Sequence, residues 1–436
     1  MKVDRDRMVQ AIRAALRSSA MRTLGIFAGG NLVVAIVSGL GGVLQSRWIP
    51  PDVFGEYRKY GILTGYLNIG LIIVQGALMR QYPYLIGRGD RIEALAVASA
   101  AKWWYLALTH VFSLLFVALA GSALLGGDLR AAAGWGVQVI AVWSAFYGVY
   151  LGVMYRTSQD FNRLTYNNLY SSTVGFALLV MVKFWDYWGV VSRNGAQLIF
   201  GLWLNHKHVP VRVKSEWDPK RLWGLAKISL PISVSGYVST SMTTATLSFV
   251  ILRYLGQTDL GIYAISLSLQ GMAMTVTASL GQMFYPKIMH KYGETESFAA
   301  CIRYALKPTA LNVVLSTVIV AVLCFMVDPF VRLIIPKYAA AIPIIRILSL
   351  SIILTAAALP FVVFVSALRY RTIGCLALVR FAACFVLIGC LPKTLAIIAW
   401  SVVGSEIVYV LVGYGLIVFT ERYGTGMTVG AKHAAT

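Results

Sequence analysis

The sequence predicts an all-α membrane protein, with twelve transmembrane helices in two six-helix bundles that are related as parallel repeats around a V-shaped central cleft. Three observations lead to this prediction. Hydrophobic residues make up 58% of the 436 residues and charged residues only 13%, whereas soluble domains carry about 25% charged residues. Apolar runs long enough to cross a bilayer recur along the whole chain. One short phrase also occurs twice, about half a chain length apart.

The formal net charge of +21 fits a membrane protein with basic cytoplasmic loops that face anionic lipids. We therefore expect no nucleic-acid partner. A basic amphipathic head (residues 1–22) precedes the first apolar run, which is too long for a signal peptide and has no small-residue cleavage pattern. This run is predicted to be a retained first helix. The five cysteines lack metal-ligand spacing, so no metal site is predicted.

A transmembrane helix needs about 20 mostly apolar residues. Twelve ranges are candidates for such helices: 23–45, 62–79, 94–120, 131–151, 168–188, 190–204, 228–252, 262–283, 305–327, 342–368, 373–391 and 395–418. The fifth and sixth run together through "KFWDYWGVVSRNGAQ", where Lys183, Asp186, Arg193 and Asn194 interrupt the apolar pattern.

These spans predict an N-terminal bundle (23–204), a basic cytoplasmic linker (205–227), a C-terminal bundle (228–420) and a cytoplasmic tail (421–436). The orientation follows from the Lys and Arg residues between the spans. The side that holds both termini carries 24 of them, against eight on the other side. Because basic loops stay in the cytoplasm, both termini are predicted to be cytoplasmic.

The repeated phrase is "RWIPPDVFGEY" (47–57) and "RYLGQTDLGIY" (253–263), which align without a gap. The copies fall between spans one and two and between spans seven and eight. A second pair, "YPYLIGRGD" (82–90) and "YPKIMHKYGE" (285–294), closes spans two and eight. Since six spans separate the copies, the halves have the same orientation and are parallel repeats. Gly55 and Gly261 are expected to let the chain turn tightly at the start of each even helix.

Four segments resemble sequences of the polysaccharide-export (O-antigen type) flippases. Two of them are the copies of the repeated phrase, and the other two are "FYPKIMHKYGE" (284–294) and "IIPKYAAAIPIIRIL" (334–348). This family belongs to the multidrug/oligosaccharidyl-lipid/polysaccharide exporter (MOP) superfamily. The resemblance implies a flippase, not an enzyme, that needs no cofactor. It would move an undecaprenyl-diphosphate-linked oligosaccharide from the cytoplasmic to the outer leaflet of the bacterial inner membrane by alternating access. The lipid-linked glycan would then enter surface or exported polysaccharide, with a glycan polymerase and a chain-length regulator as partners.

Two differences from other branches of the superfamily narrow the choice of branch. The lipid II branch of the superfamily has arginines in its second helix, whereas the middle of span two here offers only Asn68 and Gln75. Drug-extruding relatives often keep an acidic residue in an odd-numbered helix, and span one here contains none. Both departures favour the polysaccharide branch.

Ionisable groups at membrane depth cost at least about 2.5–3.5 kcal/mol, so they usually face a cavity or a partner. Among the groups expected deep or partly deep in the membrane, four cations, Lys102, Arg193, Arg346 and Arg380, outnumber one acid, Glu406. Arg380 and Glu406 are predicted to form an intramembrane ion pair, because they lie at similar depth in adjacent spans. The remaining surplus of positive charge suits a diphosphate and acidic sugars.

We therefore expect a cationic substrate-binding cleft formed by Arg47, Lys102, Arg253 and Arg346. Each of these residues also has a simpler role open to it. Lys102 and Arg346 could extend toward the nearest aqueous surface, and Arg47 and Arg253 could contact lipid headgroups.

Other functions also remain open. A drug/cation antiporter would use the same fold, although span one lacks an acid. A membrane glycan polymerase or ligase would need a large outer loop with clustered Arg and His, whereas the longest outer connections have about fifteen residues and no His. The sequence shows neither a nucleophile motif nor paired carboxylates. A scaffold without transport activity is a further alternative.

Overall fold

The computed structural model describes residues 19–295, 297–366 and 370–423, and this part of the chain is helical and contains no strand. The predicted basic head lies outside the described residues except for 19–22, and the predicted tail lies outside them except for 421–423. The described chain forms two compact units. The first contains the residues up to Gln45 together with Val74–Ala226, and the second contains Ser46–Ile73 and the residues from Lys227 onward.

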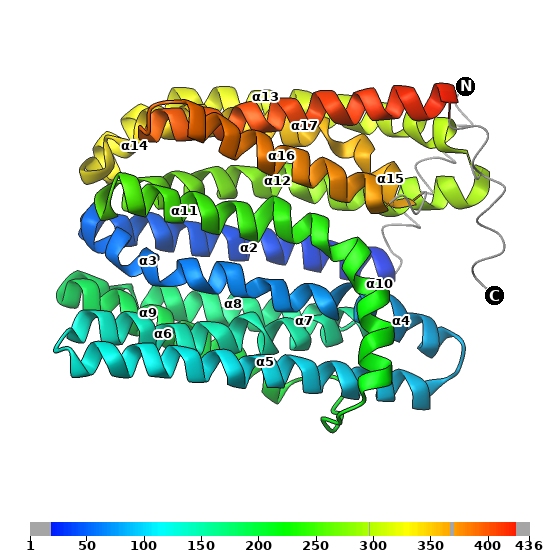
Figure 1. The fold of residues 1–436 in the computed structure, drawn as a ribbon, viewed down its shortest axis with the longest axis horizontal. Coiled ribbons are helices and arrows are strands. Elements are labelled where there is room, and N and C mark those ends of the chain that lie inside the picture. Colours follow the sequence, from blue (N-terminus) through cyan, green and yellow to red (C-terminus); the bar gives the residue numbers. More distant parts are fainter. Residues whose placement is uncertain (1–18, 296, 367–369, 424–436) are drawn as a thin grey trace. The chain divides into compact units, whose positions relative to one another are not determined.

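The helices of the first unit, labelled in Figure 1, are α2 (Ser19–Trp48, up to Gln45), α4 (Gln75–Gly87), α5 (Arg91–Leu125), α6 (Leu129–Ala145), α7 (Tyr147–Thr157), α8 (Phe161–Ala177) and α9 (Leu179–Lys207). The helices of the second unit are α3 (Pro51–Leu67), η1 (Asn68–Ile73), α10 (Pro219–Tyr237, from Lys227), η2 (Val238–Met242), α11 (Thr243–Tyr254), α12 (Gln257–Thr295), α13 (Phe298–Ile334), η3 (Pro336–Tyr338), α14 (Ala341–Ala357), η4 (Leu359–Phe361), α15 (Val362–Ser366), α16 (Tyr370–Cys390) and α17 (Leu395–Tyr423).

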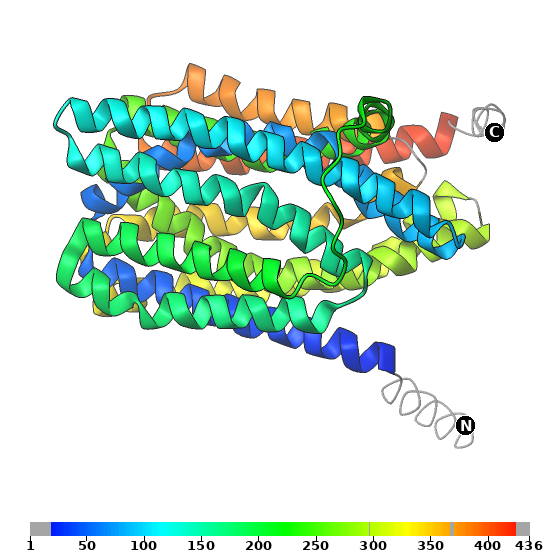
Figure 2. The ribbon, with the colours of Figure 1, turned by 90° about the horizontal axis from the view of Figure 1, so that it is seen from below.

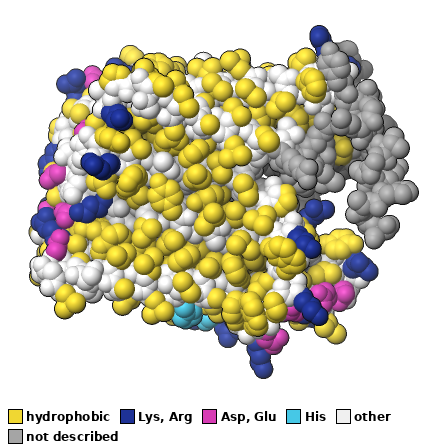
Figure 3. All heavy atoms as spheres, in the orientation of Figure 1, with side chains coloured by type: hydrophobic (Ala, Val, Ile, Leu, Met, Phe, Trp, Pro, Cys, Tyr) yellow, Lys and Arg dark blue, Asp and Glu magenta, His cyan; other side chains and the backbone are white. Residues whose placement is uncertain are grey.

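The protein is a multi-pass membrane protein. Among the described residues, six helices are long and apolar enough to cross a bilayer, or seven if the bent pair α8 and α9 counts as one span. Large apolar side chains such as Leu114 (70% exposed) and Phe325 (78% exposed) point outward. Figure 3 shows hydrophobic side chains along the middle of the helices and charged side chains toward their ends. A helix or an interrupted helix overlaps each of the twelve predicted ranges, and the count of twelve spans stays a prediction.

Aspartate caps explain where several first-unit helices begin. The carboxylates of Asp90, Asp128 and Asp160 accept hydrogen bonds from main-chain N–H groups in the first turns of α5, α6 and α8, at 3.2, 2.9 and 3.4 Å. An N-cap side chain satisfies a donor that otherwise has no partner in the helix. The apolar runs therefore start at defined positions in these three helices.

The connection between the fifth and sixth predicted spans lies at Asp186. This residue has φ 46° and ψ −119° inside α9. An ideal Cβ on Gly189 would lie only 2.2 Å from the carbonyl oxygen of Met181, although eight residues of continuous helix span about 12 Å. The chain therefore folds back at Asp186, within the polar interruption seen in the sequence. A second break, at Leu178, bends α8 against α9 by 72°.

In the second unit, α3 packs along α12, so the two copies of the repeated phrase lie against each other. The expectation that Gly55 and Gly261 form the turns was wrong, because both lie inside helices. Gly256, with φ 97°, makes the turn before α12, a conformation that glycine adopts at little cost. Pro51 at the first position of α3 starts that helix.

The predicted N-terminal bundle included Ser46–Ile73, whereas the structure groups these residues with the second unit. The close packing of α3 on α12 accounts for this grouping. Two six-helix bundles related by a cleft remain a prediction.

Candidate functional site

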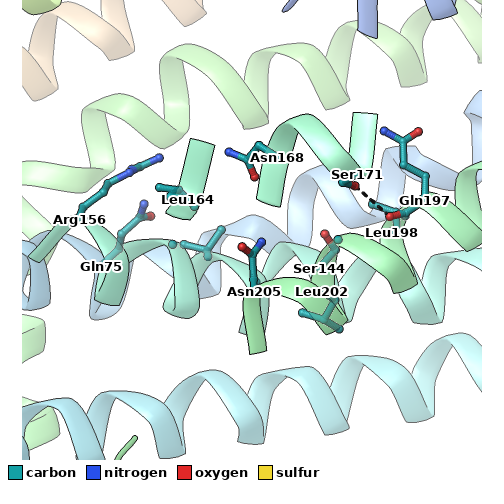
Figure 4. A pocket seen from close by; sticks show the side chains of 14 residues that line it. Gln75, Ser144, Arg156, Leu164, Asn168, Ser171, Gln197, Leu198, Leu202 and Asn205 are labelled. Atoms are coloured by element: carbon teal, nitrogen blue, oxygen red, sulfur yellow. Dashed lines mark hydrogen bonds between the residues drawn. The ribbon is translucent and has the colours of Figure 1, made fainter. Parts of the chain in front are cut away.

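A polar cavity of about 340 Å³ lies in the first unit among residues of α4, α6, α7, α8 and α9. Figure 4 shows the side chains that line it. The uncharged polar side chains among them are Gln75, Ser144, Asn168, Ser171, Gln197 and Asn205. Arg156 is the one charged residue of the lining, which contains neither Asp nor Glu. The cavity is therefore rich in hydrogen-bonding groups and carries a single positive charge.

Helical spacing brings these groups to the cavity. Gln197, Gly201 and Asn205 occur at intervals of four residues, so they share one face of α9. Glycine leaves room on the opposing helices. Gly152 in α7 lines the cavity, and an ideal Cβ built on it meets no atom within 4 Å. A larger side chain at this position would extend into the open space.

Some of the lining groups are held by neighbours. Asn205 Oδ1 accepts a hydrogen bond from Asn167 Nδ2 at 3.0 Å, and the Ser171 hydroxyl donates to the Gln197 carbonyl at 3.2 Å. By contrast, within the described part of the chain no hydrogen bond or ion pair engages the side chains of Gln75, Arg156 and Asn168. These three side chains are available to a ligand.

Lys102, which the sequence predicted to be a cleft cation, contacts the linker of its own unit. Its Nζ donates to the Val213 carbonyl at 2.7 Å, and the Ser99 hydroxyl donates to the Lys214 carbonyl at 2.7 Å. The centroids of the Trp103 and Trp217 rings lie 4.2 Å apart. Figure 2 shows the linker as the green coil between α9 and α10. These contacts attach the linker to α5.

An ion-pair cluster fixes the end of the linker. The Arg221 guanidinium donates to both carboxylate oxygens of Glu93, at 3.0 and 2.9 Å, and also pairs with Asp218. The two carboxylates raise the pKa of Arg221. The hydrogen bond from the Arg221 main-chain N–H is the main cause that lowers the pKa of Asp218. This bidentate geometry is the stronger kind of arginine–carboxylate pair.

The other three predicted cleft residues lie in the second unit and are exposed. Arg346 Nε donates to the Cys324 carbonyl at 3.3 Å. Arg253 lies over the ring of Tyr254, 5.9 Å from its centroid. Arg47 occupies the last turn of α2. In the described part of the chain no hydrogen bond or ion pair joins these three to one another. Their role as one binding set stays a prediction.

Two further cations, Arg380 and Arg193, are bound by partners within their own units. Arg380 and Glu406 form an ion pair in the second unit, with side chains 20% and 5% exposed. Arg193 in the first unit is 7% exposed. Its guanidinium donates to the Gly175 carbonyl at 2.7 Å and to the Gln45 side chain, so it links α9 to α8 and α2. Arg193 therefore has a packing role in its own unit.

Sequence reasoning missed Arg156 and most of the amides. Arg156 lies beyond the end of the fourth predicted span, so it resembled an ordinary loop cation. The available signal was the four-residue spacing of Gln197, Gly201 and Asn205 in an otherwise apolar span. Polar groups on one face of a transmembrane helix indicate a cavity or a partner.

The profile of a family described as polysaccharide biosynthesis protein matches residues 99–336, which is more than half of the chain. The chain belongs to this family. No curated protein matches it by sequence. The match covers α6 to α9, and therefore most of the residues that line the polar cavity.

Solved structures show that this family member has the MOP-superfamily transporter fold. An inward-facing multidrug resistance MATE family transporter is similar with a TM-score of 0.65 at 14% identity, over 90% of this chain and 96% of that one. A MOP superfamily transporter from Pyrococcus furiosus Vc1 gives 0.65 at 14% identity, over 93% and 97%. The lipid II flippase MurJ, in an inward closed conformation, gives 0.64 at 12% identity, over 91% and 87%.

Proposed function

We propose that this protein is a flippase that moves an undecaprenyl-diphosphate-linked oligosaccharide from the cytoplasmic to the outer leaflet of the bacterial inner membrane by alternating access. The polar, nearly uncharged cavity of the first unit carries this proposal. In a family of polysaccharide biosynthesis proteins, a cavity lined by amides, hydroxyls and one arginine suits a glycan head better than a cationic drug. A cationic drug would be expected to need a carboxylate, and the lining has none.

The proposal includes a cationic path for the diphosphate. Arg47, Arg253 and Arg346 would meet it near the outer exit and Lys102 nearer the cytoplasmic entry. Arg binds phosphate bidentately through its planar guanidinium, so Arg346→Lys should impair transport partly and Arg346→Ala more. Because Lys102 also holds the linker, its effect on transport needs to be separated from its effect on the linker.

The wider assignments are part of the same proposal. They are cytoplasmic termini, residence in the inner membrane, and a glycan polymerase and a chain-length regulator as partners. The basic residues on the side of the termini support the orientation.

The test is flipping of a labelled lipid-linked glycan in reconstituted vesicles, with equal amounts of each variant. Gly152→Leu would fill the cavity without removing a hydrogen-bonding group, and it should lower the rate at least about tenfold. Gly136→Leu is the matched control. It lies in the same unit outside the cavity lining, and its ideal Cβ also meets nothing within 4 Å. Absence of flipping by the wild-type protein would reject the function. Full flipping by a variant without Arg47, Lys102, Arg253 and Arg346 would reject the cationic path.

A further inference from the structure

The two ends of the cavity in the first unit differ chemically. Figure 4 shows Arg156 beside Gln75 at one end, and Ser171 beside Gln197 at the other. Asn205 and Gln197 are eight residues apart on α9, which corresponds to about 12 Å along the helix. A ligand that fills the cavity would therefore meet one cationic group at one end and only neutral hydrogen-bonding groups along the rest.

The neutral part of the lining is suited to hydroxyl groups. An amide side chain offers both donors and an acceptor, and a hydroxyl offers a donor and an acceptor. Sugar hydroxyls need both kinds of partner. A second phosphate would lack a cation at the Gln197 end, and a metal ion or an ammonium group would lack a carboxylate anywhere in the lining. An apolar ligand would leave Gln75 and Asn168 unpaired, which is costly for polar groups.

We propose that this cavity is a sugar-binding subsite for the sugar unit attached to the diphosphate. Asn168 and Gln197 bind the sugar hydroxyls, and Arg156 contacts a phosphate oxygen at the end of the cavity. This inference rests on the proposed function, since it places one part of that substrate in one cavity. In the predicted topology the Arg156 end faces the cytoplasm, where the substrate would enter.

The free side chains support this division of roles. The guanidinium of Arg156 and the amide of Asn168 have no partner among the described residues, whereas Asn205 is held by Asn167. The free groups can therefore form hydrogen bonds to a ligand without breaking existing ones. Gly152 borders open space in the cavity, because an ideal Cβ built on it meets no atom within 4 Å.

The test is equilibrium binding to the purified full-length protein in detergent. The probes are farnesyl diphosphate and farnesyl diphosphate carrying glucose, galactose or N-acetylglucosamine. Asn168→Leu and Gln197→Met keep similar side-chain size without the amide. Each should lower the affinity for the best sugar-bearing probe about tenfold and leave the affinity for farnesyl diphosphate unchanged. Arg156→Gln should weaken the binding of all four probes.

Matched controls lie outside the cavity. Thr173→Val removes a hydroxyl from α8 that bonds to its own helix, and Lys207→Gln removes a positive charge near the end of α9. Neither should change the sugar dependence. Melting curves identify a variant that does not fold, and Ser144→Ala, a smaller change in the same lining, then replaces it.

The proposal is overturned if no sugar raises the affinity of the wild-type protein above that for farnesyl diphosphate. It is also overturned if folded Asn168→Leu and Gln197→Met keep the full sugar dependence. Flipping assays separate this inference from the proposed function. Flipping by the wild-type protein without sugar-dependent binding rejects the subsite alone, and sugar-dependent binding without flipping rejects the flippase function alone.

Discussion

Gly55 and Gly261 occupy equivalent positions of the repeat, and each approaches the other's helix in the same way. An ideal Cβ on Gly55 would lie 1.8 Å from the carbonyl oxygen of Gln257, and one on Gly261 would lie 1.9 Å from that of Pro51. Pro51 and Gln257 are themselves equivalent positions. The repeated phrase is therefore a self-complementary helix contact, in which small residues let two backbones approach closely.

Alanine at either glycine should separate α3 from α12. The obstacle is main chain rather than a flexible side chain, so Gly55→Ala or Gly261→Ala should destabilise the protein by about 1–3 kcal/mol or more. Gly61→Ala in α3 and Gly271→Ala in α12 are controls, because their ideal Cβ atoms meet nothing within 4 Å. Thermal unfolding in detergent measures the difference. Equal melting temperatures for Gly55→Ala and Gly61→Ala would contradict the contact.

The pair Arg380 and Glu406 should behave as one unit. Removal of either side chain leaves the other charge buried, which costs about 3–5 kcal/mol for a fully buried pair. The figure is an upper value here, because Arg380 is 20% exposed. Reversal of both charges should restore folded protein better than either single reversal, as measured by the folded yield after size-exclusion chromatography. A double variant worse than both single variants would argue against the pair.

Lys102→Met should loosen the linker. This change removes the Nζ donor that bonds to Val213, and a lost hydrogen bond to a charged group corresponds to about a tenfold larger open population. Trypsin, which cuts after Arg212 and Lys214, should cleave the variant faster in detergent. Lys183→Met, at an exposed position, is the control. Lost transport with unchanged cleavage would instead favour a direct role of Lys102 toward substrate.

The orientation can be tested by labelling single cysteines in a variant without the five native ones. A membrane-impermeant maleimide added to intact cells should label Gln257→Cys, in a predicted outer connection, and should not label Ser215→Cys in the linker. Both positions are exposed, so access depends on the side of the membrane. The reverse pattern at either site would refute the predicted topology.

The sequence alone was informative where local signals suffice. Apolar runs of bilayer length located the helices, and the polar interruption around Asp186 located the turn between the fifth and sixth predicted spans. The repeat identified Gly55 and Gly261 as equivalent. Their role was misjudged, because a glycine in a turn and a glycine under a crossing helix look the same in a sequence.

The site was less accessible to sequence reasoning because its contacts are not local. Arg193 bonds to Gln45, 148 positions away, and no spacing rule connects them. Lys102 bonds to a main-chain carbonyl, so the identity of its partner residue carries no signal. Arg156 gains its place only when α7, α8 and α9 come together around the cavity.

The position of α3 has a consequence for how the two units can be combined. The chain passes to the second unit after Gln45, returns after Ile73 and crosses again after Ala226. The two units are therefore joined by three covalent crossings of the chain, and cutting the linker alone would leave two of them intact. The crossing after Ile73 adjoins the 3₁₀ segment η1. In a chimaera of the N-terminal half of one such protein and the C-terminal half of another, α3 of the first protein would have to pack against α12 of the second.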